Sequence, residues 1–131
     1  QRVAVGIEQK KLALLLAVIE KNLMLSMREL DIFINFSGGI KVIEPGTDLA
    51  LIAAILSSFR DKPLREKTVF IGEVGLNGDI RPVSQMEKRI KEALKLGFKE
   101  IFTATDIKIK PKNVQLHKVK HISELGPIIF D

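Results

Sequence analysis

Hydrophobic positions along the chain follow helical spacing in three stretches. Two long apolar runs lie within residues 7–25 and 48–59, and their length favours buried helices over strands. A third helix is predicted from residue 84 to 97, where Met86, Ile90 and Ala93 recur at helical spacing. The first run is apolar on nearly every face, so we expect both of its sides to be packed.

Short apolar segments between these runs are typical of strands. They cover residues 31–36, with a continuation at 40–42 after a bend at Ser37-Gly38-Gly39, and residues 69–71, 99–103 and 114–119. Asn77-Gly78 is a strong tight-turn signal, so a hairpin should follow the strand at 69–71 and return through Ile80. A last short helix is predicted at residues 122–129. This order indicates an α+β fold with a small mixed sheet packed against helices.

Polar residues mark the expected helix ends. Ser84, followed three residues later by Glu87, matches a capping box at the start of the third helix. Thr47 or Gly46 can cap the second helix, and Asp48 stands in its first turn, where the helix dipole favours a negative charge. Gly97 is expected to end the third helix in a left-handed conformation.

Composition narrows the class of protein. A chain of 131 residues with 46% hydrophobic residues is long enough for one domain with a real core and too short for two. The absence of cysteine excludes a disulfide framework and fits a reducing cytoplasm. The apolar runs are far shorter than a membrane span, so no membrane association is expected. A net charge of +5 is compatible with nucleic-acid binding without demonstrating it.

No cofactor or metal site is predicted in this chain. A GxxxxGK[ST] phosphate-binding loop does not occur in it, so no ATPase centre is recognisable. His117 and His121 are the only histidines, and we interpret them as surface residues because a metal site needs further ligands that the sequence does not place.

Residues 72–83, GEVGLNGDIRPV, followed by a helix and GFK, resemble the proteolytic-domain signature of the Lon family. Three further stretches resemble the same domain in the same order: AVGIEQKKLALLLAVIEK, DIFINFSGGIKV and EPGTDLALIAAILSS. Within the Lon-like domains, the chain is most similar to those at the C-terminus of the RadA (Sms) family of bacterial DNA repair and recombination proteins. The resemblance runs to about Phe102 and implies the Lon protease-domain fold, which is related to the second domain of ribosomal protein S5.

In active members of the Lon family, a serine at the start of the second helix is the nucleophile and a lysine early in the third helix is its base. Such a lysine must be partly desolvated to accept the serine proton. The resemblance places the serine position on Asp48 and the lysine position on Glu87, so both members of the dyad are missing. Lys88 does not replace the lysine, because one step along a helix turns a side chain by about 100°. No catalytic residue is therefore assigned, and Ser84 is assigned to the helix cap.

Two interpretations of this carboxylate pair stay open. If the fold holds, Asp48 and Glu87 both lie at helix N-termini near one cleft, where they could bind a divalent ion. The simpler interpretation is that each carboxylate stabilises the start of its own helix.

Basic residues gather around the hairpin exit and the third helix, and they are candidates for DNA binding: Arg81, Lys88, Arg89, Lys91, Lys95 and Lys99. Such a surface suits contacts to phosphates, which are independent of sequence and sensitive to salt. A solvated helix face with pairs such as Glu87–Lys91 explains the same residues. The chain has no tryptophan or tyrosine on which bases could stack.

The resemblance favours the binding interpretation. Proteins of the RadA family join a zinc finger and a RecA-like ATPase core to this domain, form hexameric rings, and act in recombination and branch migration on DNA. Residues 1–131 would then be a single non-proteolytic domain excised from a longer cytoplasmic protein, whose missing parts carry ATP, magnesium and zinc. Implied partners are further copies in a homo-hexamer, single- or double-stranded DNA, and the RecA-type recombinase machinery. A peptidase with a relocated dyad, and an oligomerisation module without DNA contact, remain alternatives.

Overall fold

The structure is a computed structural model that describes residues 1–39, 41–108 and 111–130. Its helices are α1 (Gln9–Leu23), α2 (Asp48–Arg60) and α3 (Met86–Lys95). Its strands are β1 (Arg2–Val5), β2 (Ile32–Asn35), β3 (Thr68–Ile71), β4 (Glu73–Val74), β5 (Ile80–Arg81), β6 (Glu100–Thr103) and β7 (Gln115–Lys118), and short 3₁₀ turns are η1 (Ser37–Gly39), η2 (Pro45–Thr47) and η3 (Ile122–Glu124). The α+β class and the three long helices are confirmed.

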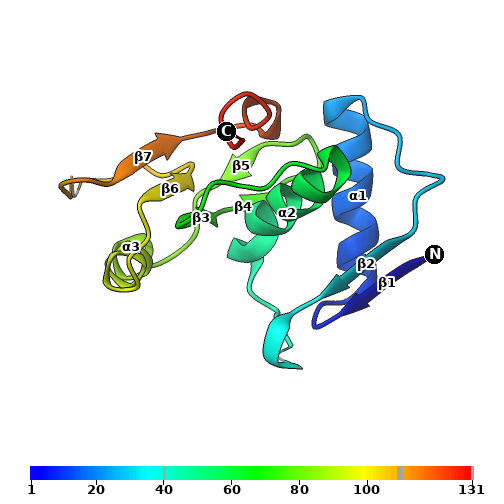
Figure 1. The fold of residues 1–131 in the computed structure, drawn as a ribbon, viewed down its shortest axis with the longest axis horizontal. Helices are drawn as coiled ribbons and strands as arrows, with labels where there is room; N and C mark the ends of the chain where they lie inside the picture. The colour runs from blue at the N-terminus through cyan, green and yellow to red at the C-terminus, as the bar shows by residue number, and fades with distance from the viewer. Residues whose placement is uncertain (40, 109–110, 131) are drawn as a thin grey trace.

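The strands form three small sheets in place of the single mixed sheet that was expected. β1 and β2 pair in parallel, β3, β6 and β7 form a parallel sheet in that order, and β4 and β5 form an antiparallel hairpin. In Figure 1, α3 lies beside the three-stranded sheet at one end of the molecule, and α1 lies with β1 and β2 at the other end.

Gly72 divides the strand that was predicted to enter the hairpin. Its amide donates to the Gly46 carbonyl and its own carbonyl accepts from the Leu49 amide, both at 3.0 Å. Residues before Gly72 therefore pair with β6, and residues after it pair with β5. The predicted turn is confirmed, with Gly78 at a φ of 82°, but the strand at residues 69–71 does not belong to the hairpin.

Alternation along the parallel strands places side chains in two apolar clusters. Phe70 and Phe102 stack with ring centroids 4.9 Å apart, in the larger cluster that includes α1 and α2. Ile71 and Ile101 belong to the smaller cluster, which packs against α3. Because successive strand residues point to opposite faces, the sheet separates α3 from the other two helices.

Two further expectations are wrong, and one strand was missed. One face of α1 is not packed, because Leu14 is 41% exposed and Ala13 and Ala17 are also exposed. The segment after η1 does not continue β2, since the Val42 amide bonds to the Gly6 carbonyl outside any strand; Ile40 lies outside the described residues. β1 was not predicted at all, because four residues become a strand only through pairing with β2.

The end of the chain is less helical than expected. Only η3 forms within residues 122–129, and the amides of Ile128 and Ile129 both donate to the Leu125 carbonyl in the turn that follows. The strands at β6 and β7 agree with the sequence-based expectation to within a residue or so. None of the helices in the described part of the chain is long and apolar enough to cross a membrane.

Candidate nucleic-acid interface and the dyad positions

Asp48 is the first residue of α2, and its side chain is fully buried. Nζ of Lys11, on α1, lies 2.9 Å from Oδ1 and 3.1 Å from Oδ2. The Val74 amide also donates to Oδ2, at 3.1 Å. Asp48 stands in the first turn of α2, as expected, and it also links α2 to α1 and to the hairpin.

The η2 turn, which directly precedes α2, is capped by Glu44. The Glu44 carboxylate accepts from the Gly46 amide at 3.0 Å, and the Thr47 hydroxyl donates to the Glu44 carbonyl. The Gly46 amide, and after it the Arg89 guanidinium, hold the pKa of Glu44 below its ordinary value. The side chain of Thr47 does not cap α2, contrary to the expectation from sequence.

The predicted capping box at the start of α3 does not form. α3 begins at Met86, and Gln85 before it has a left-handed conformation with a φ of 58° and no side-chain cap bond. The Ser84 hydroxyl makes no cap bond to α3, and the Ser84 carbonyl accepts from Nε of Arg89 at 2.9 Å. Glu87 is exposed in the first turn of α3, where its charge faces the positive end of the helix dipole.

The structure does not bring the two carboxylates into one site. Asp48 is buried against Lys11 and the Val74 amide, whereas Glu87 is exposed. Within the described residues, no group of three His, Cys, Asp or Glu side chains is placed to hold a metal ion. Glu87 instead lines a cavity of about 150 Å³ together with Thr105 and Asp106.

The six basic candidates divide into two groups by their partners. Lys88, Lys91 and Lys95 are exposed, and their spacing places them on one face of α3; Lys99, just beyond the helix, is exposed as well. In the part of the chain that the structure describes, no carboxylate lies within ion-pair distance of these four lysines. They form what we call the α3 lysine surface.

The two arginines are held by acidic neighbours. Arg81 Nε lies 2.9 Å from Asp79 Oδ2, and this hydrogen bond lowers the pKa of Asp79. Arg89 is half-buried, and its Nη2 lies 3.0 Å from Glu44 Oε1, so it joins η2 to α3. Arg89 therefore has a structural role, and the cations that remain unpaired are the lysines.

Residues 7–106, which make up most of the chain, match the family model ChlI, described as subunit ChlI of Mg-chelatase. The chain belongs to the ChlI family.

Relatives of this ChlI-family chain named DNA repair protein RadA match nearly all of it. The proteins of Haemophilus influenzae and Escherichia coli K12 are each 48% identical, over 95% and 100% of this chain, and that of Aquifex aeolicus is 38% identical over 99%. The resemblance to RadA proteins is thereby confirmed. The chain spans only 28–29% of the length of these relatives.

A charged cluster around Glu100 in the ChlI-family chain was not predicted from the sequence. Arg65 makes two hydrogen bonds to Glu100, from Nε at 2.7 Å and from Nη2 at 2.8 Å, and donates to the carbonyls of Ile128 and Phe130. His117 Nε2 lies 2.9 Å from the same carboxylate, and its ring stacks on Phe102. These residues lie far apart in sequence, so no local signal could have grouped them.

The histidines do not form a common site. Both histidines are partly exposed, and His117 lies in β7 against Glu100. His121 Nε2 lies 2.7 Å from the Asn77 carbonyl, which can only accept, so this nitrogen carries the proton. Nδ1 then accepts from the Ser123 amide. His121 thus fastens the hairpin turn to η3.

Proposed function

We propose that residues 1–131 act as a non-proteolytic Lon-like domain of a RadA-type DNA repair protein, contacting DNA through the α3 lysine surface and serving as a scaffold for a homo-hexamer. The observation that carries the DNA contact is the set of four exposed lysines without a carboxylate partner in the described chain. Unpaired lysines attract phosphates without first breaking an internal ion pair.

The proposal that the domain lacks peptidase activity rests on the dyad positions. Asp48 offers no hydroxyl nucleophile, and its buried carboxylate is already bound to Lys11 and the Val74 amide. Glu87 offers no amine to act as a base. The Ser–Lys mechanism requires both groups, so an intact Lon-type fold at these positions would still not cleave peptide bonds.

Binding through lysines predicts a particular kind of DNA recognition. Phosphate contacts are shared by all sequences and by single- and double-stranded DNA, so we expect affinity without sequence preference. Neutralising four phosphates gives a slope of about −3 to −4 in a plot of log affinity against log salt. In this proposal the domain works in the cytoplasm beside the RecA-type recombinase, and ATP, magnesium and zinc are bound by other parts of the protein.

DNA binding is best tested by fluorescence anisotropy with labelled duplex and single-stranded oligonucleotides, at salt concentrations from about 50 to 200 mM. The test variant replaces Lys88, Lys91, Lys95 and Lys99 with Glu. A matched control replaces Lys10, Lys41, Lys62 and Lys112, which are exposed and lie outside α3. Each variant changes the formal net charge from +5 to −3, so a difference between them reports position and not total charge. We expect salt-sensitive binding that the test variant loses and the control largely retains.

Other outcomes separate the alternatives. An equal loss of DNA affinity in both variants would overturn the assignment of DNA binding to the α3 lysine surface. A hexamer by light scattering without salt-dependent DNA binding would make the domain an oligomerisation module. Cleavage of an unfolded protein that is abolished by Ser84→Ala or Lys88→Ala would instead support a relocated dyad.

A further inference from the structure

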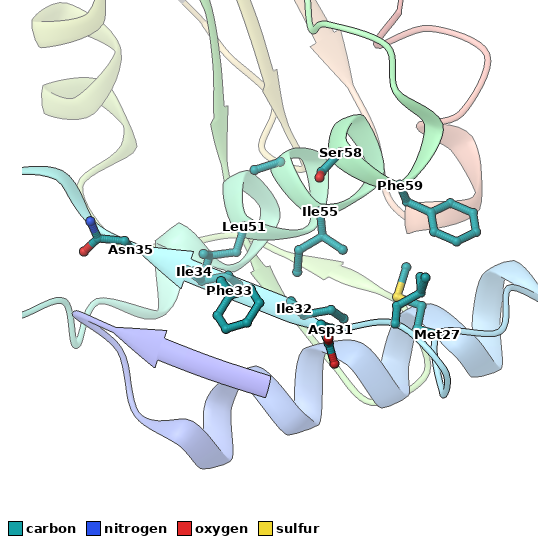
Figure 2. Close-up of a pocket in the computed structure, with 12 residues that line it drawn as sticks. Met27, Asp31, Ile32, Phe33, Ile34, Asn35, Leu51, Ile55, Ser58 and Phe59 are labelled. Atoms are coloured by element: carbon teal, nitrogen blue, oxygen red, sulfur yellow. The ribbon is translucent and has the colours of Figure 1, made fainter. Parts of the chain in front are cut away.

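An apolar groove of about 590 Å³ runs between β2 and α2. Figure 2 shows Leu51 and Ile55 of α2 facing β2 across it, with Phe33 on β2 and Phe59 at the end of α2. Phe33 is 65% exposed and Phe59 38% exposed, although both line the groove. Large apolar side chains exposed along a groove are typical of a surface that another segment covers.

The edge of β2 that faces this groove has no neighbouring strand. The Ile32 amide donates to the carbonyl of Gln1, just before β1, and the Phe36 amide donates to the carbonyl of Val5 in β1. Backbone groups alternate in direction along a strand, so those of Phe33 and Asn35 point away from β1. The described part of the chain supplies no strand to pair with them. Only an extended backbone presents donors and acceptors at the spacing that this edge requires.

The outer edge of β1 is closed, in contrast. The Gln9 side-chain amide accepts from the Ala4 amide at 3.2 Å and donates to the Arg2 carbonyl. This side chain satisfies the backbone groups that a neighbouring strand would otherwise use. The two-stranded sheet can therefore grow in one direction only, into the groove beside α2, and β1 of a second copy is not free to add to β2.

The first residue lies at one end of the groove. The amino group of Gln1 lies 2.6 Å from Oδ1 of Asp31, and Asp31 is one of the lining residues. Polypeptide joined to Gln1 would thus start beside the N-terminal end of β2. The RadA relatives are long enough to supply it, because this chain covers only 28–29% of their length.

We propose that a segment of the same polypeptide preceding Gln1 fills the groove and adds to β2 as a third strand. To reach Gln1, this strand must run toward the N-terminal end of β2, so it pairs antiparallel with β2. Every second side chain would pack on Leu51 and Ile55 and should be apolar, and the alternate ones lie beside Phe33. This proposal does not depend on DNA binding by the α3 lysine surface. An experiment can therefore overturn one of the two proposals and leave the other standing.

Thiol labelling can test this, because the chain has no cysteine. Ser58 lines the groove and is exposed, and Ser58→Cys is nearly isosteric. Maleimide labelling is compared between residues 1–131 and a form that also carries the natural preceding residues. We expect labelling at least about tenfold slower in the longer form. Ser84→Cys is the control, since Ser84 is exposed outside the groove and should react equally in both forms.

A second measurement is amide hydrogen exchange, made on the longer form and on residues 1–131. In the longer form, hydrogen exchange at the Phe33 and Asn35 amides should be as slow as at Ile32 and Ile34, which already bond within the sheet. Fast exchange at Phe33 and Asn35 in the longer form would overturn the proposal, and so would equal labelling at position 58 in both forms. Protection in residues 1–131 that increases with protein concentration would also overturn it, in favour of a second copy in the groove.

Discussion

Asp48 carries its carboxylate into the interior with an exposed side-chain fraction of 0%, and the amino group of Lys11, 32% exposed, is its counter-ion. Removing an ion from water costs several kcal/mol, which only close partners offset. Here Lys11 and the Val74 amide act as those partners. A position that resembles a nucleophile's therefore has a role in packing, and the two members of the ion pair should respond differently to mutation.

Neutralising Lys11 should cost more than neutralising Asp48. Lys11→Met leaves a buried carboxylate without its cation, and we expect a loss of about 3–5 kcal/mol in the free energy of unfolding. Asp48→Asn keeps an acceptor for Val74 and leaves a lysine that can reach water, so we expect a loss of about 1–3 kcal/mol. Urea unfolding of both variants measures this. A larger loss for Asp48→Asn would show that Lys11 is not the essential counter-ion.

At the scale of elements, α3 begins without the Ser84–Glu87 capping box that its sequence predicts. Gln85 has a positive φ, which costs a side chain with a Cβ about 1 kcal/mol or more, whereas glycine adopts it freely. Arg89 holds this end of the helix by bonding to the Ser84 carbonyl and to Glu44. The start of α3 is thus fixed by contact with η2 and not by a local capping motif.

Two substitutions separate these explanations. Gln85→Gly should raise the free energy of unfolding by roughly 0.5–1 kcal/mol, because it removes the backbone strain. Ser84→Ala should change it by less than about 0.5 kcal/mol, since the hydroxyl caps nothing. Thermal and urea unfolding give both values. If Ser84→Ala lowered the free energy of unfolding by about 1 kcal/mol, the Ser84 hydroxyl would be acting as a helix cap after all.

Across the whole molecule, Glu100 connects segments that are distant in sequence. Its carboxylate binds Arg65, which precedes β3 and also holds carbonyls near the C-terminus, and His117 on β7. Hydrogen bonds from Arg65, and then from His117, hold the pKa of Glu100 below its ordinary value of 4.5. The ionised carboxylate therefore stabilises the fold above about pH 4.5, and this contribution is lost as the pH falls through the lowered pKa.

Glu100→Gln should remove that pH-dependent part of the stability. At pH 7 we expect a loss of about 1–3 kcal/mol, because two charge-assisted bonds from Arg65 are weakened. The difference in unfolding free energy from the unmodified chain should shrink as the pH falls through the lowered pKa of Glu100, because the carboxyl then becomes protonated in the folded state as well. Urea unfolding across this range measures it, with Glu92→Gln at an exposed position as the control. A difference that is constant with pH would contradict the proposed role of the charge.

Local signals predicted what depends on neighbours along the chain. The three helices, the turn at Asn77-Gly78 and the end of α3 at Gly97, with a φ of 87°, were all found near their expected positions. The Lon and RadA resemblance likewise came from continuous stretches of sequence. Helical periodicity and glycine conformation are set by short-range sterics, so a single sequence carries that information.

Tertiary structure decided how the strands pair and which of the basic candidates have no ion-pair partner in the described chain. The sequence predicts that the strand at 69–71 leads into the hairpin, but the bonds of Gly72 to Gly46 and Leu49 place the residues before and after it in two different sheets. The six basic candidates look alike in sequence, and only their distances to Asp79 and Glu44 separate the paired arginines from the unpaired lysines. Strand pairing and ion pairing join residues far apart along the chain, and their energies depend on distances that exist only after folding.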